Sequence, residues 1–400
     1  MQTNSDYILV DNNRSLELAL INLKQANVLS IDTESSGYYT YYPKVCLLQI
    51  HAKGKTYLID PIQIPNISSL STFFLDPQKL KIFHSAQDDI RGLNRDFGFR
   101  FANIADTLIG SRLLALGQNS LFYLVEKYHQ IKLSKVEQKS NWEIRPLQVQ
   151  QLRYAALDTV YLESIWKSME EELASKHLLD EALSEFDFLS KEHYIPKESE
   201  GFQLVRFPNI IDFTPLERRK ILELLRYRDE RARKINKASF RIWPNERISQ
   251  CVKEEPKLNK CIEWFGKKDG EEVFKILTSE YSDPIEASEL TKRQGEDLDE
   301  SESSQFLQLK KWRTRVMRVR RMEHHLLPSN RQLIEIIRKQ PKSIDELGSM
   351  ALFSDWKLSN YGPGILAAIQ NQDIEKTLKG LIPIRTKEEF ALKKQKNTIE

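Results

Sequence analysis

The sequence predicts a mixed α/β domain, with helices on the faces of a sheet, followed by two all-helical domains. Up to about residue 195, short β-forming runs alternate with amphipathic stretches, which is typical of a sheet covered by helices. After that point the strand patterns fade and long amphipathic helices dominate. We expect the α/β domain over residues 1–200, the helical domains over 208–288 and 302–376, and a basic tail over 377–400.

The strands of the first domain are predicted from short apolar runs. Residues 28–31, 45–50 and 56–59 are rich in aliphatic and β-forming side chains, and the turn Lys53-Gly54-Lys55 precedes the third run. Their close spacing predicts three consecutive antiparallel strands. A fourth strand is expected over residues 80–83.

Two helices are predicted in the same domain. Residues 88–97 carry Ile90, Leu93 and Phe97 at helical spacing, and residues 146–169 show a similar apolar face. Strands that first follow one another directly and then alternate with helices predict a mixed sheet.

The helical part contains two groups that share a pattern. One begins with a long helix over residues 215–237, and the other extends from about residue 304 to 370. Their first helices are rich in arginine and lie roughly ninety residues apart, which predicts a duplicated module. The arginines are Arg226, Arg228, Arg231 and Arg233 in the first helix and Arg313, Arg315, Arg318, Arg320 and Arg321 in the second. These arginines form either a solvated face or a phosphate-binding surface. Residues 288–304 are acidic and predict a linker or an exposed helix.

Composition restricts the class of protein. The 400 residues carry a net charge of +3 and are 40% hydrophobic, which excludes a wholly disordered chain. No apolar run is long enough to span a membrane, and residues 1–9 lack the pattern of a secretory signal. Cys46, Cys251 and Cys261 are spaced for neither a disulfide framework nor a zinc site, and Cys46 is expected in the core. A monomer in the reducing cytoplasm is expected.

Asp32 and Glu34 stand at the end of the first predicted strand. Residues two apart on a strand point to the same face, so their carboxylates would repel each other unless a cation lay between them. Mg²⁺ prefers such oxygen ligands. The alternative is that Asp is common where a strand runs into a turn.

Further carboxylates follow at two helices. Asp88 and Asp89 lie where a strand gives way to a helix, with Ser85 as a potential N-cap, and Asp88 suits the first turn of a helix. Tyr154 and Asp158 are four apart on a predicted helix and therefore share a face. Each residue also has a structural interpretation, as a cap, a core aromatic or a surface charge.

Taken together, these residues resemble the ribonuclease D family of DEDDy exonucleases. The three family motifs are matched by Ile31-Asp32-Thr33-Glu34, His84-Ser85-Ala86-Gln87-Asp88-Asp89-Ile90 and Tyr154-Ala155-Ala156-Leu157-Asp158. The match of the second motif selects Asp89 rather than Asp88. Asp106-Thr107 and the run from Lys139 to Leu147 also look like this family.

The two helical groups resemble HRDC domains. The second is the better match, through Leu309 to Arg313, Leu326 to Asn330, Pro341 and Leu358 to Gly362. The first fits from Ile221 to Lys237 but departs from the pattern around Ile242-Trp243-Pro244 and from Cys261 to Phe265.

The resemblance implies an RNase H-like fold and a site with two divalent metal ions, Mg²⁺ or Mn²⁺. It implies that Asp32 bridges both ions, that Glu34 and Asp158 hold the ion that activates water, and that Asp89 holds the other. Tyr154 would orient the attacking water, because a phenol with a pKa of about 10 is a poor base at neutral pH.

Substrate contacts are expected from Thr33, His84, Tyr38 and Tyr39. A lone histidine after a strand, such as His84, is more often a structural residue than a catalytic one. Strand packing or base stacking explains the cluster of Tyr38, Tyr39, Tyr41 and Tyr42. The resemblance implies a 3′→5′ exoribonuclease that trims structured RNA such as tRNA precursors and releases nucleoside 5′-monophosphates. A DNA 3′→5′ exonuclease and a non-catalytic nucleic-acid-binding scaffold are the alternatives.

Overall fold

The computed structural model describes residues 7–386 and 390, except 65, 134–135, 196–203, 291–297 and 323–325. Most of the predicted basic tail and part of the predicted acidic linker therefore lie outside the described residues. The described chain divides into two compact units: residues 7–34, 45–194 and 298–390 form the first, and residues 35–44 and 195–290 form the second. No helix among the described residues is long and apolar enough to cross a membrane.

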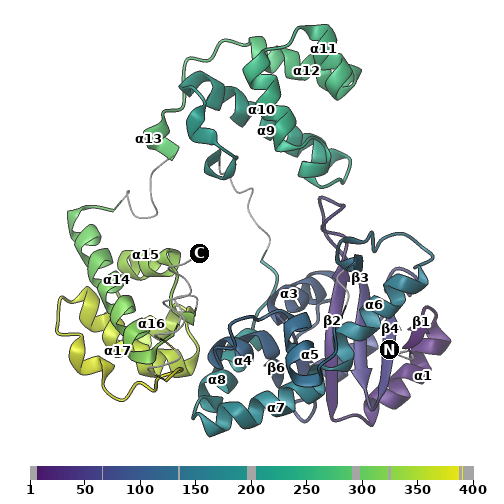
Figure 1. Ribbon diagram of the computed structural model, residues 1–400, viewed down its shortest axis with the longest axis vertical. Coiled ribbons are helices and arrows are strands. Elements are labelled where there is room, and N and C mark those ends of the chain that lie inside the picture. Colours follow the sequence, from purple (N-terminus) through teal and green to yellow (C-terminus); the bar gives the residue numbers. More distant parts are fainter. Residues whose placement is uncertain are drawn as a thin grey trace. The chain divides into compact units, whose positions relative to one another are not determined.

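The first unit contains a six-stranded mixed sheet with the order β1-β4-β3-β2-β5-β6 (Figure 1). The strands are β1 (Tyr7–Val10), β2 (Val28–Ser35), β3 (Val45–Ala52), β4 (Lys55–Ile59), β5 (Leu80–Phe83) and β6 (Ile104–Asp106). β3 and β4 are antiparallel, whereas the pairs β1–β4, β2–β5 and β5–β6 are parallel. The predicted mixed sheet is thus confirmed.

The two edge strands were not predicted. β1 has four residues and β6 has three, so neither is long enough for a clear alternation of apolar and polar residues. β6 matters for the site because its parallel pairing with β5 places Asp106 opposite Phe83. The carboxyl ends of β5 and β6 therefore lie at the same edge of the sheet.

Helices cover both faces of the sheet. They are α1 (Asn13–Lys24), α2 (Ser71–Leu75), α3 (Ala86–Phe97), α4 (Thr107–Leu113), α5 (Leu121–His129), α6 (Val149–Val160), α7 (Leu162–Ser175) and α8 (Leu179–Ser190). A small core beneath α6 contains Cys46, Leu58 and Trp142, so Cys46 is a core residue as expected. A larger core contains α3, α7 and α8.

The stretch predicted as helical over residues 146–169 consists of two helices that meet at Tyr161. The apolar residues of α6 pack in the small core, with Leu152 and Ala156 among them. Those of α7, including Ile165 and Trp166, pack in the large core. The apolar face of one straight helix points to one side. The break at Tyr161 lets the apolar faces of α6 and α7 point to different cores.

Ser85 does not cap α3 through its side chain, contrary to the expectation. It adopts a left-handed conformation with φ of 73°, and its hydroxyl accepts no capping bond. The carboxylate of Asp106 accepts instead from the backbone N–H groups of Ser85 and Ala86, at 3.0 and 2.9 Å. The helix that carries Asp89 is therefore anchored by a residue from β6.

The helical groups are built from four main helices each. The first has α9 (Pro215–Lys234), α10 (Asn245–Glu254), α11 (Leu258–Phe265), α12 (Lys267–Thr278) and the short α13 (Ala287–Leu290). The second has α14 (Glu300–Arg320), α15 (Asn330–Lys339), α16 (Ile344–Ser349) and α17 (Asp355–Ile369).

One contact supports duplication of the module. In the first group, Arg228 donates to the carbonyl of Trp243 at 2.8 Å and to Oδ1 of Asn245 at 2.9 Å. In the second, Arg313 donates to the carbonyl of Pro328 and to Oδ1 of Asn330, both at 2.9 Å. Each arginine holds the start of the next helix at the same sequence separations, 15 and 17 residues.

The same register extends on both sides of this contact without a gap. Buried Leu224 corresponds to Leu309 and buried Ile248 to Leu333, and the left-handed residue Glu255 corresponds to Gln340. The segment Ile242-Trp243-Pro244, which the sequence pattern set apart from the module, is therefore in register. The helices after Pro256 have different lengths in the two groups.

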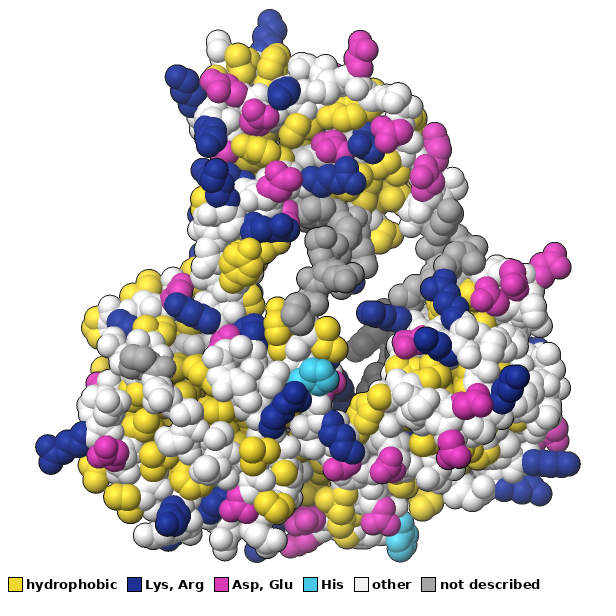
Figure 2. All heavy atoms as spheres, turned by 180° about the vertical axis from the view of Figure 1, so that it is seen from behind, with side chains coloured by type: hydrophobic (Ala, Val, Ile, Leu, Met, Phe, Trp, Pro, Cys, Tyr) yellow, Lys and Arg dark blue, Asp and Glu magenta, His cyan; other side chains and the backbone are white. Residues whose placement is uncertain are grey.

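The arginines of α9 and α14 are mostly engaged within the chain. Besides the two arginines above, Arg231 pairs with Asp269, Arg315 with Glu375 and Arg320 with Glu181. Basic and acidic side chains are interspersed on the face drawn in Figure 2. The sequence predicted either a solvated face or a phosphate-binding surface. The arginines named here form neither, because their guanidinium groups bond to other residues of the chain.

The second helical group packs on α8 within the first unit. Arg320 and Glu181 form an ion pair at 2.5 Å, and their side chains are 0% and 1% exposed. Arg320 also donates to the hydroxyl of Tyr361, and Lys357 pairs with Glu185 at 2.6 Å. The hydrophobic residues of this group belong to the same core as α7 and α8, so the larger core is shared between the α/β domain and the second helical group, whereas the small core beneath α6 belongs to the α/β domain alone.

Candidate active site

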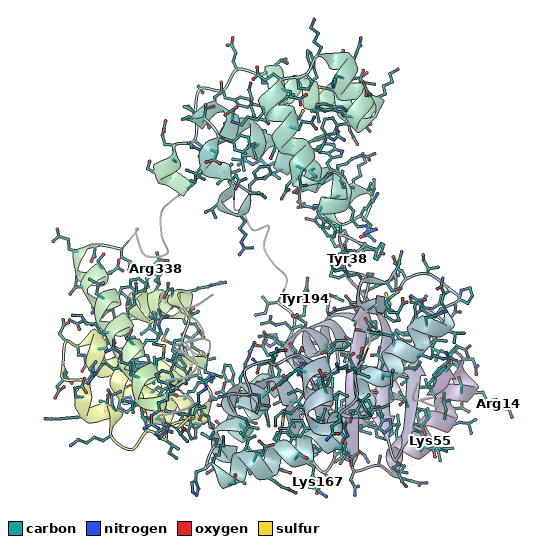
Figure 3. The ribbon with its side chains drawn as sticks, in the orientation of Figure 1. Arg14, Tyr38, Lys55, Lys167, Tyr194 and Arg338 are labelled. Atoms are coloured by element: carbon teal, nitrogen blue, oxygen red, sulfur yellow. The ribbon has the colours of Figure 1, made fainter. Side chains whose placement is uncertain are left out.

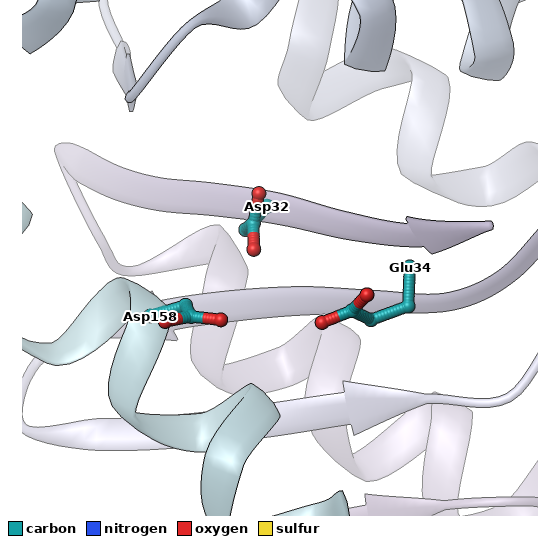
Figure 4. A group of neighbouring side chains, drawn as sticks. All are labelled: Asp32, Glu34 and Asp158. Atoms are coloured by element: carbon teal, nitrogen blue, oxygen red, sulfur yellow. The ribbon is translucent and has the colours of Figure 1, made fainter. Parts of the chain in front are cut away.

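Three carboxylates converge between the sheet and α6. Asp32 and Glu34 project from the same face of β2, and Asp158 projects toward them from α6 (Figure 4). Each offers an oxygen, and these ligand atoms lie within 4.8 Å of one another. An oxygen cluster of this size has the composition that Mg²⁺ and Mn²⁺ prefer.

Asp89 is the fourth carboxylate, and it lies beside the cluster at the start of α3. It is buried, and its Oδ1 accepts from the hydroxyl of Thr33 at 2.5 Å. Asp88 is exposed to solvent. The sequence pattern alone could not distinguish Asp88 from Asp89. In the structure, Asp89 lies beside the strand that carries Asp32 and Glu34, and Asp88 does not.

Burial raises the pKa of all four carboxyl groups, and repulsion by neighbouring carboxylates adds to it for three of them. Burial, followed by the charge of Asp158, raises the pKa of Asp32 well above its usual value. Burial and then the charges of Asp32, Asp158 and Asp89 raise the pKa of Glu34, and burial and Asp32 raise the pKa of Asp89. Burial raises the pKa of Asp158 to about 7. Ionised carboxylates in such a site require a compensating cation.

Tyr154 lies one turn before Asp158 on α6. Its hydroxyl hydrogen-bonds Asp158, and its ring lies 6.2 Å from that of buried Trp142. Burial, followed by the charges of Asp158, Glu34 and Asp32, raises the pKa of Tyr154. The hydroxyl therefore stays protonated, which suits a hydrogen-bond donor and not a base.

Thr33 and His84 make contacts within the protein. The hydroxyl of Thr33 is engaged by Asp89. Nδ1 of His84 lies 2.9 Å from the hydroxyl of Thr107, which itself donates to the carbonyl of Phe83. Because Thr107 has one proton to give, Nδ1 of His84 is the donor in their bond, and burial lowers the pKa of His84. A substrate contact by either residue stays a prediction.

Tyr38 and Tyr39 lie in the loop of residues 35–44, which belongs to the second unit. The guanidinium of Arg241 lies 5.2 and 4.0 Å from their ring centroids. The predicted substrate role of these tyrosines is also untested by the structure.

Asp106 looked like the family in the sequence, but its role as a support of the site was missed. The carboxylate of Asp106 accepts from four backbone N–H groups, those of Ser85, Ala86, Leu108 and Ile109. Asp before Thr-Leu at the end of an apolar run is a helix-capping signal, which could have identified the contacts to α4. The contacts to α3 join residues twenty apart and have no local signal.

The comparisons with known proteins agree with this geometry. Residues 7–174 match the family described as 3′-5′ exonuclease, and the match includes the four carboxylates and Tyr154. The chain has a 3′-5′ exonuclease domain. Residues 304–369 match the HRDC domain, so the second helical group is an HRDC domain as the sequence predicted.

Relatives connect the exonuclease domain to two named groups of proteins. The chain is 32% identical over 263 residues to exosome complex exonuclease RRP6 of Saccharomyces cerevisiae, covering 61% of this chain and 36% of the relative. It is 29% identical over 252 residues to ribonuclease D of Haemophilus influenzae, covering 62% of this chain and 63% of the relative. The chain thus spans less than two thirds of either relative.

A solved structure extends the likeness beyond the exonuclease domain. The exoribonuclease RNase D of Escherichia coli matches with a TM-score of 0.59 and 21% identity, over 92% of this chain and 99% of that one. The shared fold confirms the predicted order of a mixed α/β domain followed by helical domains.

Proposed function

We propose that the chain is a metal-dependent 3′→5′ exoribonuclease that releases nucleoside 5′-monophosphates by two-metal-ion hydrolysis. The observation that carries this proposal is the convergence of Asp32, Glu34 and Asp158 within 4.8 Å, in a domain that matches 3′-5′ exonucleases. Release of a nucleoside 5′-monophosphate from the 3′ end breaks the bond between phosphorus and O3′ of the preceding nucleotide, with water supplying the new oxygen on phosphorus. Because digestion in this proposal starts at the 3′ end, a free 3′ end is the required feature of the substrate.

The donor set fits divalent cations. It is built from oxygens alone, and burial makes the uncompensated charges unfavourable. Asp32, Glu34 and Asp158 would hold one ion, and Asp89 together with Asp32 would hold a second. Bound ions of this kind lower the pKa of water and stabilise charge on a departing oxygen.

The other residues act as orienting groups in this proposal. Thr33 fixes the carboxylate of Asp89 through its hydroxyl. Tyr154 keeps its proton and donates a hydrogen bond to Asp158, and its hydroxyl oxygen can accept a hydrogen bond from an attacking water beside Asp158. Tyr38, Tyr39 and His84 are proposed as substrate contacts.

RNA is the favoured substrate because the relatives are named ribonuclease D and exosome exonuclease RRP6. Structured RNA with a 3′ extension, such as a tRNA precursor, is the proposed class, and the HRDC domain is proposed to bind nucleic acid. We also propose a monomer that works in the cytoplasm. A DNA exonuclease and an inactive nucleic-acid-binding scaffold are the rival functions.

The test compares Asp89→Asn with Asp88→Asn in the full chain. Purified proteins are incubated with 5′-labelled 3′-extended tRNA, with a DNA strand of the same sequence, and with Mg²⁺, Mn²⁺ or a chelator. We expect stepwise loss from the 3′ end of RNA by the wild type and Asp88→Asn, but not by Asp89→Asn or in chelator.

The alternatives give different results. Faster digestion of the DNA strand would make the chain a DNA exonuclease, and binding of RNA without digestion in any metal would make it a scaffold. A 3′-terminal phosphate should block the reaction, and rapid cutting of a circular RNA would exclude an exonuclease.

A further inference from the structure

The loop that follows Glu34 is held by the first helical group. The N–H of Ala238 donates to the carbonyl of Tyr39 at 3.0 Å, and the N–H of Tyr42 donates to Oδ1 of Asn236 at 3.0 Å. The hydroxyl of Tyr41 donates to Asp229 at 2.9 Å. Backbone and side-chain bonds at three successive sites fix the conformation of this loop.

The fixed loop presents aromatic rings to solvent. Tyr38 is 40% exposed, Tyr42 is 57% exposed, and Phe240 of the helical group is 48% exposed. The rings of Tyr38 and Phe240 lie 5.3 Å apart. Aromatic rings that are exposed side by side leave apolar area in contact with water. Such a patch is typical of a surface that binds a ligand or a partner.

Basic side chains lie beside these rings. The guanidinium of Arg241 lies 5.2 Å from the ring centroid of Tyr38, and that of Arg233, which also pairs with Asp229 at 3.3 Å, lies 5.7 Å from the centroid of the neighbouring Tyr41. Lys234 and Lys237 are exposed on the same segment. Rings with basic groups between them match single-stranded nucleic acid, in which bases stack on rings and phosphates meet cations.

The covalent chain limits the distance from this surface to the carboxylates. Tyr38 follows Glu34 by four residues, and four extended residues span at most about 14 Å. A strand whose 3′ end occupies the carboxylate cluster can therefore reach Tyr38 within a few nucleotides. This limit favours RNA over a protein partner as the occupant.

We propose that Tyr38, Tyr42, Phe240 and Arg241 form a stacking surface for single-stranded RNA just upstream of the 3′-terminal nucleotides. The inference rests on the proposed exoribonuclease function and adds a role for the first helical group, which holds and completes the surface. In the repeat register, Leu326 of the second helical group corresponds to Arg241 of the first. The cation of the surface is therefore particular to the first helical group.

The test measures RNA binding without turnover. Full-length Asp32→Asn serves as the background, and fluorescence anisotropy gives its Kd for a dinucleotide and for a single strand of about ten nucleotides, in Mg²⁺. Added to this background, Tyr38→Ala and Phe240→Ala should each weaken binding of the longer strand about tenfold. Binding of the dinucleotide should change less than twofold.

Two further variants separate stacking from charge. Tyr38→Phe keeps the ring and should bind like the background. Arg241→Gln should lower the log–log slope of affinity against salt by about 0.7, the value for one phosphate of a single strand. The matched control is Tyr194→Ala, which removes another aromatic ring that is 39% exposed and lies 5.7 Å from a guanidinium, that of Arg95. Tyr38 and Tyr194 are both labelled in Figure 3. Binding of both RNAs by the Tyr194→Ala variant should be unchanged.

The results distinguish this proposal from the function on which it rests. Equal loss for the dinucleotide and the longer strand would overturn the surface and leave the exonuclease intact. Unchanged binding of both RNAs in Tyr38→Ala and Phe240→Ala would also overturn it, and would assign the patch to a protein partner. Failure of the unsubstituted chain to digest any RNA would remove the proposed function itself. Circular dichroism of every variant checks that the fold is kept.

Discussion

At the scale of single residues, the carboxylate cluster has a cost in the absence of metal. Four acidic side chains lie close together, two of them buried and two half-buried, and the charges of Asp32, Asp89 and Asp158 raise the pKa of neighbouring carboxyl groups. A protein can tolerate such repulsion where a ligand relieves it. We therefore expect the local stability of the cluster to depend on the concentration of divalent cations.

We predict that Asp32→Asn abolishes nuclease activity without loss of stability. Asparagine keeps the shape of the side chain but removes the charge that raises the pKa of both Glu34 and Asp89. Loss of outer contacts to a metal already costs 10–100-fold, so loss of a direct ligand should reduce kcat/KM by more than about a hundredfold.

Thermal unfolding with and without Mg²⁺ provides the accompanying measurement. Wild-type protein should be stabilised by about 2.7 kcal/mol when Mg²⁺ is at a hundred times its Kd, and the variant much less. In chelator the variant should unfold no earlier than the wild type. Activity near that of the wild type would remove Asp32 from the metal site.

We also predict that Tyr154→Phe lowers kcat by about a hundredfold, the typical effect of removing one oriented donor. The phenyl ring preserves packing against Trp142, whereas the hydroxyl next to Asp158 is lost. Steady-state kinetics should show KM nearly unchanged. A change in KM alone would indicate that Tyr154 contacts substrate and does not orient the attacking group.

At the scale of elements, the helical repeat explains why the first group was only partly predicted. The hydrophobic spacing of α9 and α14 was visible in the sequence, as was their similar content of arginine. The contacts of Arg228 and Arg313 were not, because each joins a helix to a residue 15 or more positions away. A basic side chain in a helix gives no local sign that its partner is a carbonyl.

The carboxylate site shows the same limit. Asp32 and Glu34 share a strand face, and Tyr154 and Asp158 share a helix face, so both pairs could be predicted from periodicity. Family resemblance, and not spacing, selected Asp89. The anchoring of α3 by Asp106 and the holding of the tyrosine loop by residues 236–241 depend on tertiary contacts.

We predict that Gly270→Ala destabilises the first helical group. Alanine normally stabilises a helix relative to glycine by up to about 1 kcal/mol. At position 270, however, an added Cβ would lie 2.6 Å from backbone atoms of Cys261 and Ile262, so α11 and α12 must move apart. The expected loss is about 1–3 kcal/mol in urea unfolding.

Gly110→Ala provides the matched control for this substitution. There the added Cβ would lie 3.3 Å from Sδ of Met169, which is a flexible side chain. The gain in helix propensity should roughly balance the contact. If both variants lose equal stability, close approach of α11 and α12 is not the reason.

At the scale of the whole molecule, the HRDC domain and the exonuclease domain share a core and a buried ion pair. The second oxygen of Glu181 and Nε of Arg320 have no partner among the described residues. Such a pair is costly to desolvate and still more costly to break on one side.

We predict that Arg320→Met lowers the free energy of unfolding by about 3–5 kcal/mol, because Glu181 is left buried without its cation. The double variant Glu181→Leu with Arg320→Met should recover most of that loss. A double-mutant cycle in urea measures the coupling. Effects that simply add would show that the pair does not join the two domains energetically.

The contacts of the tyrosine loop, residues 35–44, affect the order in which parts of the protein can fold during translation. Tyr41 leaves the ribosome 188 residues before its partner Asp229, a delay of roughly 10–40 s at 5–20 residues per second. During that interval the strand carrying Asp32 and Glu34 can already pair with its neighbours in the sheet, while the loop directly after it has nothing to hold it. The proposed RNA surface is thus completed late in translation, after the catalytic carboxylates have been synthesised.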